Sequence, residues 1–404
     1  MALRRRISLL AVLPLVATLG CGGGAAPTQQ GIPVGLLLSF SGFLAASSIN
    51  SERALILALE AANAAGGVGG KPLYVIARDT RSDAALVAEP ARQLVEAGAA
   101  ILIGPDTTDL ATALRPILED RTMLLPSFAT SSDIDFKPAP WFVMGPSVGR
   151  VACELVAQLR ADGRQNPLVI VNPSGYNSRL SWDLVHTYGM PKFVLPRDRS
   201  PNTADVHPLT SVAADAFILA AFPRAGSALV NALATLGALG DPTRWYLSPT
   251  LHTPAFIRGV PVGLLINARG VAPGTTAGAA AFRDAFQERW HDTPFDDAYP
   301  FFDAGAVAAL ALERALGREG AIPSGTGLSK HVMAVTRSGA TPITWSEIGR
   351  GLQLLRSGQE VSYVGLLGSM EFDSAGLTPS ASTKWWTIAP EGFADRAGEG
   401  DCRR

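Results

Sequence analysis

The glycine-rich run at residues 66–71 (GGVGGK) has the residue types of a phosphate-binding loop, whose backbone N–H groups hold an anion. Such a loop runs from a strand through the glycines into a helix. Here the order is reversed, because a helical apolar pattern over 51–64 precedes the glycines and a strand-like run over 73–77 follows them. Ala65 also stands where a phosphate loop has its first glycine. The run therefore predicts a helix stop and a strand start rather than a nucleotide site.

No set of residues has the spacing of a catalytic or metal site. The five histidines are scattered, and the motifs HExxH and CxxC are missing. His252 is expected to be a solvated loop residue, and Asp296 and Asp297 to lie in a surface loop or at a helix start. We therefore expect no enzyme, no cofactor and no bound metal.

Polar residues gather instead directly after predicted strands. The runs 34–38, 100–103, 123–125 and 168–171 each lead into a polar loop. Ligands of open parallel sheets bind outside the carboxyl ends of the strands. The pattern therefore predicts a small-molecule site made by these loops. Asp106 could serve there as an acid, or be a turn residue beside Pro105.

Strand-like apolar runs alternate with helical patterns almost throughout the chain, which predicts parallel sheets covered on both faces. The predicted strands are 34–38, 73–77, 100–103, 123–125, 168–171, 216–220, 245–247 and 263–266. The predicted helices are 51–64, 83–96, 109–119, 148–162, 178–188, 225–239, 279–289 and 302–316. Because strand–helix units lie both before residue 148 and after residue 168, we expect an α/β fold with two doubly wound parallel-sheet lobes.

The N-terminus has the pattern of a targeting segment. Three arginines at 4–6 precede an apolar run over 7–20, which is too short to span a bilayer core of about 30 Å. Cys21 follows a small residue, and this junction resembles the lipobox of bacterial lipoproteins, in which the cysteine carries the lipid. We expect a signal peptide at 1–20 and a linker at 21–31; an ordinary secretory signal that contains Cys21 is the alternative. Both predict export.

Composition excludes other classes of partner. The net charge of −1 provides no basic face for nucleic acid, and 47% hydrophobic residues with 17% charged residues can fill sizeable cores. The mature chain of about 380 residues suggests two domains. Its remaining cysteines are Cys153 and Cys402. We expect two unpaired thiols, with Cys153 packed in a helix and Cys402 in a polar tail over 394–404.

A series of sequence blocks resembles one known family. The blocks lie at 55–79, 102–105, 126–130, 175–176, 299–304 and 368–376. Their order resembles type 1 periplasmic binding proteins, and within them the leucine/isoleucine/valine-binding receptors of ABC transporters. The resemblance implies two lobes joined by three crossovers near 145–148, 271–274 and 366–370. Lobe 1 would then comprise 32–146 plus 275–365, and lobe 2 would comprise 147–274 plus 366–393.

The resemblance also implies which residues contact a ligand between the lobes. Hydroxyl and backbone N–H groups would hold a carboxylate, and aromatic rings would cover the ligand. The residues implied are Phe43, Thr107, Thr108, Ala129, Thr130, Tyr176, Phe222 and Thr250. Thr108 could instead be only a helix N-cap, and each aromatic residue only part of the core.

Thr250 departs from the family pattern. Amino-acid receptors of this family place a carboxylate at this position, where it pairs with the ammonium of the ligand. A buried ammonium without a counter-charge is costly. An ordinary α-amino acid is therefore disfavoured, and the ligand's identity stays open, as do the membrane involved and the oligomeric state.

We therefore expect a lipoprotein of the bacterial cell envelope, periplasmic and lipid-anchored to a membrane. It would capture a small polar or amphipathic ligand, such as an amino acid, an amide or a carboxylate, and present it to the permease subunits of an ABC importer. The alternative is a sensing or protein-interaction lipoprotein with a degenerate cleft, which Thr250 and the small loop residues at 219–221 would suit.

Overall fold

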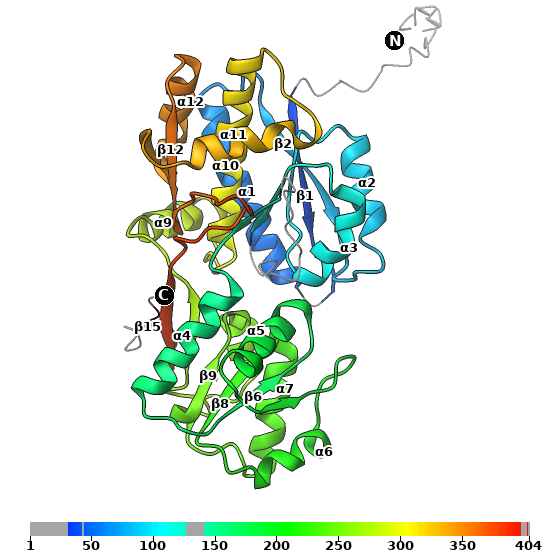
Figure 1. Ribbon diagram of the computed structural model, residues 1–404, viewed down its shortest axis with the longest axis vertical. Coiled ribbons are helices and arrows are strands. Elements are labelled where there is room, and N and C mark those ends of the chain that lie inside the picture. The colour runs from blue at the N-terminus through cyan, green and yellow to red at the C-terminus, as the bar shows by residue number, and fades with distance from the viewer. Residues whose placement is uncertain (1–30, 43, 127–140, 397–401, 403–404) are drawn as a thin grey trace, which may run out of the picture. The chain divides into compact units, whose positions relative to one another are not determined.

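The computed structural model describes residues 31–42, 44–126, 141–396 and 402 (Figure 1). No helix within these ranges is long and apolar enough to cross a membrane. The described strands form two main sheets and one small sheet.

The first sheet has five parallel strands in the order β2-β1-β3-β4-β5. The strands are β1 (Ile32–Leu38), β2 (Leu73–Asp79), β3 (Ile101–Ile103), β4 (Met123–Pro126) and β5 (Trp141–Met144). Successive side chains point to opposite faces, so Leu36 enters one core cluster and Leu37 another. Helices α2 (Ala88–Glu96) and α3 (Thr108–Leu118) cover one face, and α1 (Ala45–Ala64) covers the other (Figure 1).

A later part of the chain completes this first lobe. Its helices are α9 (Gly278–Trp290), α10 (Ala298–Glu319), α11 (Ser329–Thr336) and α12 (Ile348–Arg356). A three-stranded sheet of β11 (Thr341–Thr344), β12 (Val361–Gly365) and β13 (Gly368–Ser369) packs beside them. Helix α10 lies along α1, and Gly305 permits the approach, because a Cβ there would come within 2.8 Å of Ala58.

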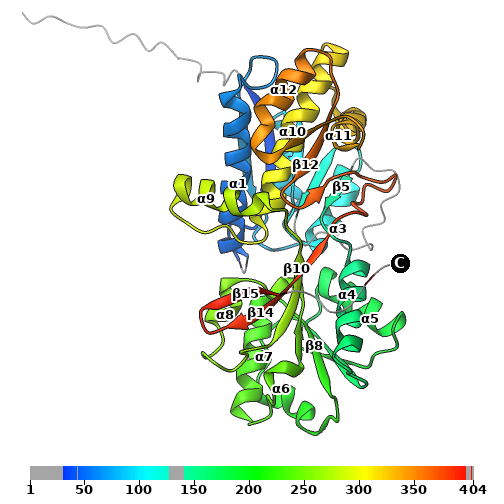
Figure 2. The ribbon, with the colours of Figure 1, turned by 90° about the vertical axis from the view of Figure 1, so that its left-hand side faces the viewer.

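The second lobe has a seven-stranded sheet in the order β15-β14-β10-β9-β8-β6-β7. The parallel strands are β6 (Pro167–Val171), β7 (Lys192–Val194), β8 (Ala216–Ala220), β9 (Trp245–Leu247) and β10 (Arg269–Pro273). Strands β14 (Thr383–Ala389) and β15 (Gly392–Arg396) are antiparallel additions. Helices α4 (Val148–Ala161) and α5 (Gly175–His186) cover one face, and α7 (Pro223–Thr235) covers the other (Figure 2). The short helices α6 (Thr203–Val206) and α8 (Pro254–Arg258) flank α7.

The predicted pair of doubly wound α/β lobes is confirmed, but one predicted strand is wrong. Residues 263–266 form turns, and the strand is β10. The side chain of Leu265 is buried and holds these turns against the core, so the apolar residues at 263–266 do not indicate a strand. Gly270 and Pro273 weaken the strand signal of β10. Gly270 is needed because the Trp386 ring lies where a Cβ would be, 2.1 Å away.

The third passage between the lobes lies later in the chain than predicted. Instead of crossing at 366–370, the chain stays with the first lobe, where the Phe372 ring packs on Phe142 with centroids 4.9 Å apart. Thr378 then donates a hydrogen bond to the carbonyl of Gly145 at 2.9 Å. The chain joins the second sheet only at β14. The earlier crossings lie between β5 and α4 and between β10 and α9.

The expectation of two unpaired thiols is wrong. Cys153 of α4 and Cys402 form a disulfide, with their Cα atoms 5.7 Å apart. The tail over 394–404 is polar, but its first residues belong to β15, which pairs with β14 in the second sheet. The disulfide therefore connects the end of the chain to the same lobe.

The glycine-rich loop binds the protein's own side chains. Gly69 donates its N–H to a carboxylate oxygen of Glu313 on α10 at 3.0 Å. Arg356 on α12 pairs with Glu313 at 3.1 Å and donates to the carbonyls of Ala65 and Gly67. The predicted helix stop and strand start are confirmed, and the loop connects α1 to two other helices of the first lobe.

The loop gives a test with a matched control. Gly67→Ala should destabilise the protein more than Gly70→Ala. Both glycines have a positive φ (+68° and +78°), so both variants carry the left-handed strain, but only a Cβ at Gly67 meets backbone, the Lys71 carbonyl oxygen 2.0 Å away. We expect a further loss of about 1–3 kcal/mol in the free energy of unfolding, measured by urea titration. Equal losses would contradict this packing.

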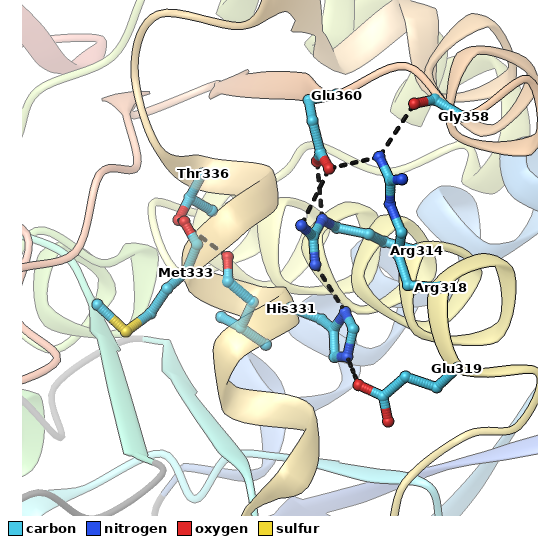
Figure 3. Close-up of polar contacts among 9 residues, drawn as sticks. Arg314, Arg318, Glu319, His331, Met333, Thr336, Gly358 and Glu360 are labelled. Carbon is cyan, nitrogen blue, oxygen red and sulfur yellow. Dashed lines mark hydrogen bonds and ion pairs between the residues drawn. The ribbon is translucent and has the colours of Figure 1, made fainter.

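A buried histidine joins two helices of the first lobe (Figure 3). Arg314 donates to Nδ1 of His331 at 2.9 Å, and Nε2 of His331 donates to Glu319 at 2.7 Å. Since an arginine can only donate, Nδ1 is the acceptor and the imidazole is neutral. Arg314 also forms two hydrogen bonds to Glu360, and Lys330 pairs with Glu319 at 2.7 Å. Burial and the nearby charge of Arg314 lower the pKa of His331 despite the attraction of Glu319.

Because His331 is buried in its neutral form, we expect the stability of the protein to depend on pH. The folded pKa of His331 lies below the usual 6.5, so its stabilising contribution is complete above pH 6.5 and is lost as the pH falls toward the folded pKa. We expect the wild type to lose melting temperature between about pH 7 and pH 5 more steeply than His331→Gln, which cannot titrate. His207→Gln at an exposed position should keep the wild-type slope. Equal slopes for wild type and His331→Gln would refute the assignment.

Candidate functional site

A cavity of about 530 Å³ lies between the two lobes, beyond the carboxyl ends of their strands. The first lobe contributes residues that follow β2 and β3, and the second lobe contributes residues that follow β6, β7 and β8. The lining comprises 82–84, Thr107, Asp109, Leu110, 172–174, 197–200, Phe222, Arg224 and Ala225. This is the edge at which the sequence predicts a ligand site.

Two of the predicted ligand residues line this cavity together. Thr107 comes from the first lobe and Phe222 from the second. Thr107, rather than Thr108, is the N-cap of α3, and its hydroxyl accepts a hydrogen bond from the N–H of Leu110 at 3.4 Å. Thr108 is the first residue of α3, is buried, and packs against Gly175 of the second lobe.

Tyr176 lies elsewhere. It lines a separate space of about 30 Å³ that Met144, Pro249 and Asp296 also border. The side chain is 3% exposed, and burial raises the pKa of Tyr176, so its hydroxyl stays protonated at neutral pH. Tyr176 therefore does not line the cavity of Thr107 and Phe222, although it shares a buried apolar cluster with Phe222.

The Thr250 hydroxyl forms its hydrogen bonds within the second lobe. It donates to the carbonyl of Ala221 at 2.6 Å and lies 2.7 Å from the hydroxyl of Ser248. The side-chain oxygen of Asn177 is 3.4 Å away, and Thr250 is 1% exposed. A threonine held in this way provides no charge for a ligand ammonium.

The remaining predicted residues cannot be placed. Phe43, Ala129, Thr130 and the lipidation candidate Cys21 lie outside the described residues.

The second-lobe wall of the cavity carries cationic side chains that sequence analysis did not single out. Arg197 and Arg224 are exposed and make no ion pair with any residue in the described part of the chain. Arg199 instead binds Asp205 through two hydrogen bonds of 2.5 and 2.6 Å, which lowers the pKa of Asp205 to about 2. The first-lobe wall carries Asp83 and Asp109. For Arg224 the available signal was its position after the predicted strand at 216–220, whereas Arg197 follows β7, which was not predicted.

The N-terminus of α7 also faces the cavity through Arg224 and Ala225. Its N-cap residue is Phe222, which supplies no side-chain hydrogen bond to the first turn. The first N–H groups of a helix have no partner within the helix and favour an anion. Two guanidinium groups and a helix start therefore attract negative charge to this wall, and the carboxylate of Asp198 on the same wall partly offsets them.

Asp106 is buried below the first-lobe wall. Its carboxylate accepts hydrogen bonds from the N–H and hydroxyl of Ser39 and from the hydroxyl of Ser48, each at 3.0 Å. Burial raises the pKa of Asp106 despite these bonds. Its bonds hold the end of β1 and the start of α1 beside the end of β3, so Asp106 positions the loops and does not contact the cavity.

The side chain of His252 is largely enclosed, with 10% of it exposed, rather than solvated. Its Nδ1 pairs with Asp296, and its ring stacks on Trp386 with centroids 4.7 Å apart. Lys384 lies 3.6 Å from the other oxygen of Asp296. Burial alone would raise the pKa of Asp296, but His252 and Lys384 lower it. In the part of the chain that the structure describes, no group of three or more His, Cys, Asp or Glu side chains could hold a metal ion.

Comparison with known proteins gives the family. The sequence profile described as "Periplasmic binding protein" matches residues 31–339. The chain belongs to the periplasmic binding protein family. No curated protein sequence matches it significantly.

Solved structures show the same fold at low sequence identity. LivK, a leucine-binding protein from Thermotoga maritima, has a TM-score of 0.73 and 14% identity, covering 91% of this chain and 98% of its own. LivJ from Streptococcus pneumoniae, in complex with isoleucine, has a TM-score of 0.71 and 17% identity, covering 91% and 99%. A solute-binding protein of an ABC transporter from R. palustris, in complex with benzoate, has a TM-score of 0.69 and 15% identity, covering 93% and 99%. The fold is therefore that of type 1 periplasmic binding proteins, as predicted.

The internal bonds of Thr250 give a second test. Thr250→Val should lower the free energy of unfolding by about 1–3 kcal/mol, because it leaves the buried Ala221 carbonyl and Ser248 hydroxyl without this partner. Thr235→Val is the control, since Thr235 makes a similar bond to the carbonyl of Asn231 at 2.9 Å but is exposed. Urea titration of both variants measures the two free energies of unfolding. Similar small losses would show that the Thr250 bonds are not structural.

Proposed function

We propose that the protein is an extracytoplasmic solute receptor that captures a small organic carboxylate between its lobes for an ABC importer. The observation that carries this proposal is the cavity of about 530 Å³ at the strand ends of both sheets, with Arg197 and Arg224 on one wall. Membership of the periplasmic binding protein family supports the receptor function. A fold of this kind binds a ligand by closing its two lobes over it, and no catalytic step is needed.

The charge of the walls favours a carboxylate over an ordinary α-amino acid. Arg197, Arg224 and the start of α7 attract an anion and outweigh Asp198 on the same wall, whereas Thr250 provides no charge for an ammonium. Asp83 is the carboxylate of the opposite wall that a ligand ammonium could reach. On the opposite wall, Asp109 already accepts an N–H from the second lobe. Similar folds accommodate both ligand types, since the LivJ structure holds isoleucine and the R. palustris structure holds benzoate. A carboxylate without an ammonium group, as in benzoate, suits this cavity better than an amino acid does.

The disulfide supports a location outside the cytoplasm. Bonds such as Cys153–Cys402 persist in oxidising compartments and are rare in the cytosol. Together with the signal-like N-terminus, this suits export, and Cys21 is the residue that we propose carries a lipid anchor.

Ligand binding tests the proposal. We expect benzoate or an aliphatic carboxylate to raise the melting temperature of the purified protein, whereas benzamide should not. Ligand at 100 times its Kd stabilises the folded state by about 2.7 kcal/mol. Calorimetry should then show about tenfold weaker carboxylate binding for Arg224→Gln, since a hydrogen bond to a charged group is lost.

Arg258→Gln is the matched control, because Arg258 is an exposed second-lobe arginine on α8 and does not line the cavity. Stabilisation by leucine or isoleucine but by no carboxylate would overturn the ligand class. Absence of any stabilising solute would favour the sensing or protein-interaction alternative.

A further inference from the structure

We propose that Asp109 and Gly175 are a positioning pair that holds the two lobes together beside the cavity. Asp109 is in the first turn of α3 in the first lobe, and Gly175 is the first residue of α5 in the second lobe. A carboxylate oxygen of Asp109 accepts a hydrogen bond from the Gly175 N–H at 2.8 Å. The effect of this pair on ligand affinity rests on the proposed function, whereas its effect on lobe contact does not.

The bond satisfies a group that α5 cannot satisfy itself. The first N–H groups of a helix have no intrahelical acceptor. Ser174, the N-cap of α5, accepts the N–H of Asn177 with its hydroxyl and that of Ser178 with its carbonyl. The Gly175 N–H instead points to Asp109. A carboxylate at a helix N-terminus gains both a charge-assisted hydrogen bond and the attraction of the helix dipole.

The glycine is required by the close approach of the two helix starts. A Cβ at Gly175 would lie 2.9 Å from the Thr108 Cβ and 3.0 Å from the N and Oδ1 atoms of Asp109. The φ of Gly175 is not in the left-handed region, so its backbone conformation would accept another residue. The lobe contact, rather than the local backbone, therefore selects glycine here.

The pair lies at the wall of the cavity. Asp109 lines the cavity next to Thr107 and Leu110, and Ser174 lines it from the second lobe. Separation of α3 from α5 would open this wall. The pair therefore favours the closed arrangement, and a ligand would bind more tightly when the pair forms, because part of the closure is already stabilised.

The test compares Asp109→Ala, Asp109→Asn and Gly175→Ala with the wild-type full chain. The first readout is amide hydrogen exchange without ligand. We expect the Gly175 amide to exchange at least about tenfold faster in Asp109→Ala, because the variant removes its acceptor. Asp109→Asn keeps an acceptor oxygen but not the charge, so its Gly175 amide should exchange at a rate between those of the wild type and Asp109→Ala. Asp109→Ala and Gly175→Ala should both increase the radius of gyration measured by small-angle X-ray scattering.

Gly149→Ala is the matched control for the added methyl group. Gly149 is also in the first turn of a second-lobe helix, α4, and its Cβ would have no neighbour closer than 4.0 Å. It should keep wild-type exchange and scattering. Melting temperatures of the full-length variants verify that each one is folded under the conditions of the measurement.

The second readout is the Kd for benzoate, which should rise about tenfold in Gly175→Ala, a variant that leaves the charge of the cavity wall unchanged, and stay unchanged in Gly149→Ala. Unchanged exchange and scattering in Asp109→Ala and Gly175→Ala would overturn the pair, even if benzoate binds. If benzoate and other carboxylates fail to bind the wild type while exchange and scattering change as expected, the pair stands and the proposed ligand class falls.

Discussion

The first lobe depends on the buried carboxylate of Asp303, in the N-terminal part of α10. It accepts hydrogen bonds from the Tyr363 hydroxyl at 2.7 Å and from the N–H groups of Leu366 and Leu367 at 2.9 and 3.2 Å. A Cβ at Gly365 would lie 2.4 Å from one of its oxygens, so glycine is needed where the chain passes the carboxylate. The Asp303 side chain is fully buried, and this burial raises its pKa to about 6. These bonds hold the segment that leads back toward the second lobe.

Helix α10 therefore organises the lobe through polar as well as apolar contacts. Asp303 holds the segment after β12, and Glu313 further along the helix holds Gly69 and Arg356. The rest of α10 packs along α1 against the first sheet. Because a buried polar group without a partner is costly, each of these bonds also specifies which segment lies where. The strand ends that form the cavity wall are fixed by this framework.

The same rule explains which polar residues face the cavity. Asp106 and Thr250 are satisfied by neighbouring backbone and hydroxyl groups, so they form the support behind the two walls. Arg197 and Arg224, which have no ion pair within the described ranges, are the groups left for a ligand. The proposal of an anionic ligand rests on these two cations, although Asp83 and Asp198 also line the cavity.

The sequence by itself determined the alternation of helices and strands, the two-lobe α/β fold and the edge of the sheets at which a site forms. Periodic apolar patterns of long helices such as α1, and buried parallel strands such as β1, are local signals that survive in the folded protein. The three-residue strands β3 and β9 are fully buried and apolar and could be found, whereas β7 and β13 are partly exposed and have no apolar run.

Only the tertiary structure decided the partners. The Cys153–Cys402 disulfide, the His252–Asp296 pair and the Asp109–Gly175 contact each join residues far apart in the chain. No local pattern indicates that His252 is largely enclosed or that Gly175 meets a second helix start. Hydrogen bonding and close packing depend on positions in space, so the choice between a supporting and a ligand-facing side chain is made only when the lobes are assembled.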